Sequence, residues 1–170
     1  MNLNKFLQFS FIILLLGATS IVFSQSRIIN VPSGVGTLNE AIDGDTTATG
    51  ERVDPDNTVY VLERDGFYLL TGTIENRFPL RIWAAEGSGK RPILQPGVSE
   101  GGESSSPFRP LDNFHIKGLY VTNMDELGQI LLRTIRVSAD NAKIIVDDCH
   151  VDYTCLLYTS DAADEEDSVD

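Results

Sequence analysis

The residues of this sequence whose types could support chemistry gather between residues 117 and 152. Carboxylates are ligands that a hard cation such as Ca²⁺ prefers, and four of them are candidates: Asp125, Asp147, Asp148 and Asp152. A basic side chain could take a proton from a substrate, and three are candidates: Lys117, Lys143 and His150. Metal or acid–base chemistry would require neighbouring strands that bring such residues together.

Each of these residues also has an ordinary structural explanation. Asp147-Asp148 falls where the chain is expected to turn, and Asp is favoured in turns because it bonds to nearby backbone. Lys117 and Asp147 could equally form a surface ion pair. His115 and His150 fall at outward positions of their predicted strands, where contact with solvent is enough to explain them. We favour the structural explanation for each of them.

Other motifs indicate structure rather than chemistry. The segment 44–57 holds several aspartates without the spacing of an EF-hand, so we interpret it as a solvated loop. The glycines at 34–36 and 87–89 lack the full spacing and following helix of a phosphate-binding loop, which favours turns. Trp83 is expected to be a partly buried aromatic rather than one that stacks on a sugar. The sequence has no nucleophile elbow, dinucleotide fingerprint or zinc-ligand spacing.

The N-terminus has the layout of a secretory signal. One cation, Lys5, precedes a mostly apolar run over 6–23, and cleavage is expected after Ser24. The run is short of the ~20 apolar residues that a membrane-spanning helix needs. The sequence therefore predicts a signal peptide over 1–24 and a mature chain that is secreted or on the cell surface, without a stable membrane span.

The C-terminus is unusual. From Cys155 the chain reads Cys-Leu-Leu-Tyr-Thr-Ser-Asp-Ala-Ala-Asp-Glu. This resembles the in-frame translation of a transposase adapter used to build sequencing libraries. We therefore expect 155–170 to be an artefactual, disordered tail on the N-terminal part of a longer protein. A natural acidic tail would fit the composition but not this resemblance. Cys149 is then a small buried hydrophobe rather than half of a disulfide.

The charge balance is acidic with or without these two ends. The formal net charge is −12 for the whole chain, and it is −7 for residues 25–154, which hold 19 acidic and 12 basic residues. An acidic surface argues against nucleic acid and anionic membranes as partners, because both require an excess of Lys and Arg. It leaves sugars as candidate partners.

Residues 25–154 are expected to be mostly strands. Runs rich in Val, Ile, Tyr and Phe alternate with polar residues, which is typical of β-structure. The longest helical pattern is Thr37 to Gly44, where Thr37 and Glu40 have the spacing of a capping box. Parallel strands without crossover helices are the property of a solenoid.

A thirty-residue repeat carries the prediction of a solenoid. Aligning 116–121 with 146–151 makes three pairs of apolar or small residues coincide: Ile116 with Val146, Leu119 with Cys149, and Val121 with Val151. Fixed periods of this length are typical of stacked coils, in which like residues stack on like residues to build one core. The same stacking would place Asp147 beside Lys117.

The order of these motifs resembles the N-terminal part of pectin-lyase-like proteins, a superfamily of right-handed parallel β-helices that includes pectate, alginate and chondroitin lyases. The motifs that carry the resemblance are the Thr37–Ile42 helix, the strand 57–62, Asp65-Gly66-Phe67-Tyr68, and Ile116-x-Gly118-Leu119-x-Val121. It implies an all-β, right-handed parallel β-helix over 25–154, with an N-terminal cap, one short helix and the first few turns. It specifies fold better than activity.

The resemblance also implies candidate functions. In lyases of this superfamily, Ca²⁺ or a cationic side chain neutralises a uronate carboxylate while Arg or Lys abstracts the neighbouring ring proton. We therefore expect a secreted protein that acts on or binds polysaccharide, with a lyase whose catalytic turns lie mostly beyond this sequence as one outcome. The alternative is a non-catalytic adhesive, structural or glycan-binding β-helix. In both cases the last turn, 144–153, is expected to present an open edge that self-associates.

Overall fold

The computed structural model describes residues 26–98 and 106–153, and the backbone alone of 156–159. The predicted signal peptide and most of the predicted tail lie outside these residues and stay predictions. Within the described ranges, no helix is long and apolar enough to cross a membrane.

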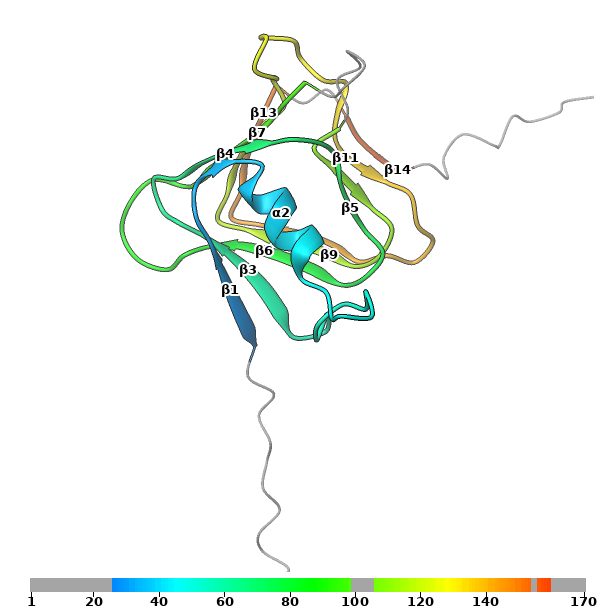
Figure 1. Cartoon of the computed structure of the whole chain (residues 1–170). Coiled ribbons are helices and arrows are strands. Elements are labelled where there is room, and N and C mark those ends of the chain that lie inside the picture. The colour runs from blue at the N-terminus through cyan, green and yellow to red at the C-terminus, as the bar shows by residue number, and fades with distance from the viewer. Residues whose placement is uncertain (1–25, 99–105, 154–155, 160–170) are drawn as a thin grey trace, which may run out of the picture.

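The chain winds as a coil whose strands form three parallel sheets (Figure 1). The first sheet contains, in order, β1 (Arg27–Val31), β3 (Thr58–Leu62), β6 (Leu80–Ala84), β9 (Phe114–Lys117) and β12 (Ile144–Asp147). The second contains β2 (Gly34–Val35), β4 (Phe67–Leu70), β7 (Ile93–Pro96), β10 (Tyr120–Thr122) and β13 (His150–Asp152). The third contains β5 (Ile74–Asn76), β8 (Phe108–Pro110), β11 (Arg133–Val137) and β14 (Leu156–Thr159). About four turns are present, which confirms the predicted parallel β-helix.

The helix α2 (Thr37–Gly44) lies across the N-terminal end of the coil (Figure 1). Its predicted end at Gly44 is confirmed, and Leu38 and Ile42 are buried against the core. The predicted capping box is wrong, because Thr37 is already helical and Gly36 is the N-cap, in a left-handed conformation with φ 71°. The Thr37 hydroxyl instead donates to the Pro32 carbonyl (2.8 Å), which fastens the helix to the preceding strand.

The thirty-residue register is confirmed between the last two turns. Ile116 pairs with Val146, and Val121 pairs with Val151. At the corner between these strands the His150 N–H donates to the Leu119 carbonyl (2.8 Å), and Cys149 packs as a free, partly buried thiol against the core. Earlier turns keep the same stacking with other lengths, since 22 residues separate Tyr60 from Ile82 and 34 separate Ile82 from Ile116.

The corner between the first and second sheets requires left-handed backbone in the later turns. Asp65, Gly118 and Asp148 occupy this corner in three turns, with φ of 60°, 71° and 46°. Asp and Gly tolerate that region better than other residues, which is why the turn interpretation of Asp147-Asp148 holds. The chain can therefore change direction sharply within two residues.

A partly buried ion pair fastens the loop 45–57 to the first turn. Asp45 is 9% exposed and accepts two hydrogen bonds from Arg27, each 2.7 Å long, and one from the Tyr60 hydroxyl (2.9 Å). The hydrogen bonds from Arg27 hold the pKa of Asp45 below its usual range. The prediction of a plainly solvated loop is therefore wrong at this residue.

The last described turn is more open than those before it. Ile116 is fully buried, but Val146, which stacks on it, is 43% exposed. Both β12 and β13 form the outer edge of their sheets. Beyond them the backbone of β14 pairs with β11, so residues 156–159 form a strand in a segment that we expected to be disordered. The origin of that segment stays a prediction.

Candidate functional site

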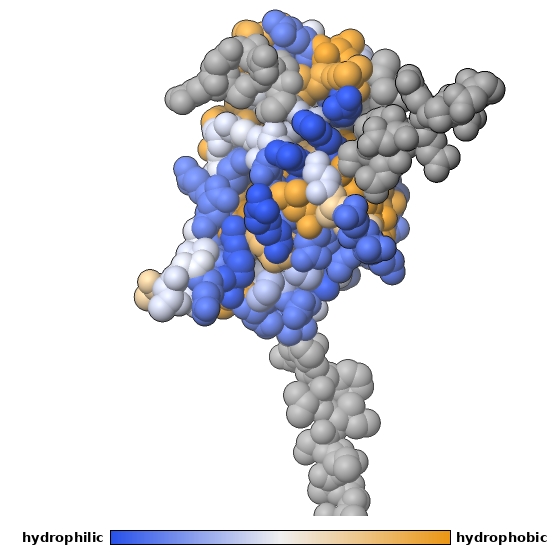
Figure 2. Space-filling view, turned by 90° about the vertical axis from the view of Figure 1, so that its right-hand side faces the viewer, coloured by the Kyte–Doolittle hydropathy of each residue, from blue (hydrophilic) through white to orange (hydrophobic). Residues whose placement is uncertain are grey.

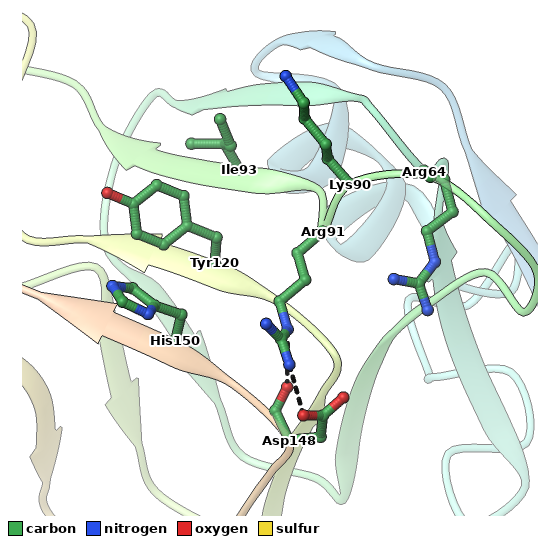
Figure 3. A pocket seen from close by; sticks show the side chains of 8 residues that line it. Arg64, Lys90, Arg91, Ile93, Tyr120, Asp148 and His150 are labelled. Carbon is green, nitrogen blue, oxygen red and sulfur yellow. Dashed lines mark hydrogen bonds and ion pairs between the residues drawn. The ribbon is translucent and has the colours of Figure 1, made fainter.

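A hollow lies on the outward side of the second sheet (Figure 3). It measures about 600 Å³ and opens to solvent. One wall comes from strand residues, Ile93, Tyr120 and His150, and the other from the corner loops, Arg64, Gly89, Lys90, Arg91 and Asp148. We refer to these eight residues as the groove.

The strand wall is a ladder of ring and apolar side chains. Parallel pairing places Phe67 beside Ile93, Ile93 beside Tyr120, and Tyr120 beside His150. Tyr120 and His150 meet edge to face, with ring centroids 4.9 Å apart. Phe67 is 44% exposed at the other end. Because each residue comes from the same position of a successive turn, the ladder runs across the strands, along the axis of the coil.

The loop wall gathers positive charge in an otherwise acidic protein. Arg91 forms an ion pair with Asp148 (2.5 Å), and its Nε also donates to the Asp148 carbonyl (3.1 Å). The Arg64 Nε donates to the Ala85 carbonyl (2.7 Å), which fixes the guanidinium beside the corner. Figure 3 shows Lys90 pointing away from the Arg91–Asp148 pair. Three cations against one acid give this wall a net positive charge.

Tyr120 is held in its neutral form. Its hydroxyl donates to the Asp152 carboxylate, and this hydrogen bond together with burial raises the pKa of Tyr120 to about 12. The phenol is therefore protonated at neutral pH and can present a ring face and a hydroxyl oxygen to a ligand. It cannot serve as a base there.

The structure disperses the metal candidates that the sequence suggested. Asp147 lies 3.9 Å from Lys117, as the repeat predicted, Asp148 pairs with Arg91, and Asp152 accepts from Tyr120. Asp125 is buried, and its Oδ1 accepts from two backbone N–H groups of its own loop, at 2.9 and 2.8 Å. Within the described ranges no three acids, histidines or cysteines gather as a metal site would require.

The candidate bases lie in three different settings. His150 is in the groove, at an exposed outward position as expected. Lys117 is on the outward face of the first sheet, bound to Asp147 and 5.7 Å from the Trp83 ring centroid. Lys143 lines a separate, smaller hollow on that sheet. The candidate bases therefore lie apart from one another, and His150 is the one that shares the groove with a candidate acid, Asp148.

Sequence reasoning missed the cations of the groove. Arg64, Lys90 and Arg91 lie in corner loops that precede the second sheet by two or three residues, so each enters the same wall. The available signal was a cation two or three residues before β4 and before β7, at the same corner of successive turns. That signal required the register of the earlier turns, which loops of unequal length conceal.

Comparison with known proteins adds no assignment: no family model matches the chain, and the curated proteins contain no match to it. The class that the architecture defines is a mostly-β protein built as a parallel β-solenoid of about four turns.

Proposed function

We propose that this chain is part of a secreted, pectin-lyase-like β-helix protein and that it binds an acidic polysaccharide along the groove. The observation that carries this proposal is the pairing of the ring ladder with three cations on the opposite wall. Sugar rings pack on aromatic side chains, and Arg or Lys recognises carboxylate or sulfate groups. A ladder along the coil axis suits an extended polymer rather than a compact ligand.

Binding is supported better than catalysis within the described residues. A lyase needs a base near the cation that neutralises the uronate, and the Tyr120 hydroxyl is held protonated by Asp152. His150 remains as a candidate proton acceptor at the end of the ladder, and this is the one observation that favours a lyase. A lyase is therefore the second candidate function, and Ca²⁺ is the cofactor that it would use.

The experiment titrates the chain with alginate, pectate and chondroitin, with dextran as a neutral polymer, and measures binding by calorimetry. Lys90→Gln should weaken binding of the preferred acidic polymer by about two- to fivefold, since an exposed ion pair contributes up to about 1 kcal/mol. Tyr120→Ala should weaken it by a similar factor through loss of ring contact. Arg136→Gln, an exposed arginine of the third sheet, is the charge-matched control.

The same samples separate binding from reaction. Ultraviolet absorbance of an unsaturated product, with and without Ca²⁺, would establish the lyase. Equal binding by the wild type and both groove variants would refute the groove, and tighter binding of dextran than of the acidic polymers would refute the role of the cations.

A further inference from the structure

A second hollow lies on the outward face of the first sheet, apart from the groove. It measures about 200 Å³, and its lining includes Arg81, Asn113, His115, Lys143 and Ile145. Arg81 pairs with His115 across β6 and β9, and His115 pairs with Ile145 across β9 and β12, so the hollow spans three turns. Since one water molecule occupies about 30 Å³, the hollow has room for a small ion but not for a length of polymer.

Two ring nitrogens lack a hydrogen-bond partner: one belongs to His115, which lines the hollow, and the other to Trp83, which lies beside His115 outside the lining. The Trp83 Nε1 and the His115 Nε2 are buried, and neither has a hydrogen-bond partner among the described residues. The two rings meet edge to face, with centroids 5.3 Å apart. Buried polar groups in folded proteins nearly always have a partner, and an unpaired donor therefore requires an explanation such as an unseen ion.

The charges around His115 are mostly positive. Arg81, Lys117 and Lys143 act on it from β6, β9 and the segment before β12, and Asp147 is the acid that acts on it. Asp147 is already engaged by Lys117 at 3.9 Å. Burial lowers the pKa of His115 most, Asp147 raises it, and the three cations lower it, so the net shift is downward and the imidazole is mostly neutral at neutral pH. The hollow therefore offers N–H donors and cations, with no acid on its lining.

From this arrangement we propose that the hollow binds a small oxyanion, a carboxylate or sulfate group, between Arg81 and Lys143 with His115 as a hydrogen-bond donor. Because His115 Nε2 is buried in the present structure, the ring must turn for this nitrogen, carrying the proton, to donate to an anion in the hollow. A neutral donor between two cations is selective for oxyanions over cations and over neutral sugars. This site uses a different sheet from the groove and does not depend on it.

The composition of the chain provides separate reporters for the two sites. It has one tryptophan, Trp83, and two histidines, of which His115 lies in this hollow and His150 in the groove. The chain is titrated with sodium sulfate and, separately, sodium acetate, with sodium chloride at equal ionic strength as the reference. Imidazole nuclear magnetic resonance follows each histidine, and Trp83 fluorescence follows the surroundings of His115, whose ring Trp83 contacts.

The expected result is a saturating change in Trp83 fluorescence and a rise in the pKa of His115, because a bound anion stabilises the protonated ring. Comparison of the acetate and sulfate arms shows which oxyanion the hollow prefers. The imidazole resonances of His150 change only if the groove also binds the anion. Failure of binding at one site is therefore distinguishable from failure at the other.

Variants decide whether the response comes from this hollow. Lys143→Gln should lower the affinity for the anion by about two- to fivefold. Arg81→Gln should lower the affinity by a similar factor, and Arg81→Lys should restore most of it. Arg81 also donates to the Asp56 carbonyl (2.8 Å), so its loss affects more than the hollow. Lys143→Gln is therefore the decisive change. Arg136→Gln is again the control. A response that is absent, that grows linearly with salt, or that is unchanged in Lys143→Gln overturns the proposal.

Discussion

The ion pair of Asp45 makes a quantitative prediction about how the first turn is held. Its side chain is 6% exposed and accepts from Arg27 and from the buried Tyr60 hydroxyl. Breaking a fully buried ion pair costs about 3–5 kcal/mol. The Arg27 side chain is 35% exposed, so water recovers part of that cost, and Asn would keep one acceptor. We therefore expect Asp45→Asn to lower the free energy of unfolding by about 2–3 kcal/mol.

Urea unfolding at pH 7, followed by far-ultraviolet circular dichroism, measures this loss. With an m-value of about 1–3 kcal/mol per M, the midpoint should fall by about 0.7–3 M. Asp43→Asn is the matched control, because Asp43 is an exposed acid two residues earlier and should change the free energy of unfolding by less than about 0.5 kcal/mol. Equal midpoints for Asp45→Asn and Asp43→Asn would refute the reasoning.

The same pair predicts a pH dependence with a definite sign. Arg27 holds the pKa of Asp45 below its value in the unfolded chain, which is about 3.9. The stabilisation is therefore complete above that pH and is lost as pH falls through the lower, folded pKa. The gap between wild type and Asp45→Asn should narrow below about pH 4. A gap that stays constant in acid would show that the charge of Asp45 is not its cause.

Two further predictions concern the stacked core and its open end. Ile116→Ala should destabilise the chain by about 2–5 kcal/mol because Ile116 is fully buried between Ile82 and Val146. Val146→Ala should cost less than about 1 kcal/mol because Val146 is 43% exposed. Thermal unfolding of the two variants measures the difference. We also propose that the chain self-associates through β12 and β13, so sedimentation should show mass rising with concentration, and Val146→Lys should reduce it. Similar stability of the two alanine variants, or a wild type that stays monomeric at all concentrations, would contradict these expectations.

The sequence predicted the fold where successive turns have the same length. Ile116 and Val146 are thirty residues apart with no insertion between their turns, so the stacked pair is visible as a repeat. Tyr60 and Ile82 form an equivalent pair at 22 residues, and Ile82 and Ile116 another at 34. Loops of unequal length break the period there, although every turn must bury its inward-facing residues in the same way.

The candidate site was less predictable because it depends on contacts between distant loops. Arg91 and Asp148 are 57 residues apart, and no local pattern joins them. Lys117 and Asp147 were predictable because they share the register of the two turns whose repeat was recognised. A contact between two residues can be predicted from a solenoid sequence once the turns that contain them have been aligned. The loop wall of the groove includes residues of earlier turns, whose alignment the sequence did not show.

Gly118 explains why the groove forms at this corner. Arg91 and Asp148 belong to two coil turns that are separated by the turn of Gly118. Their ion pair therefore crosses a position that has no side chain. A Cβ at Gly118 would lie 3.2 Å from the Ala84 Cβ and 4.0 Å from an Arg64 guanidinium nitrogen. The positive φ of 71° already favours glycine at this turn. The residue that the corner needs for its backbone is therefore also the one that leaves room for two arginines to converge, and the charge of the groove follows from the geometry of the coil.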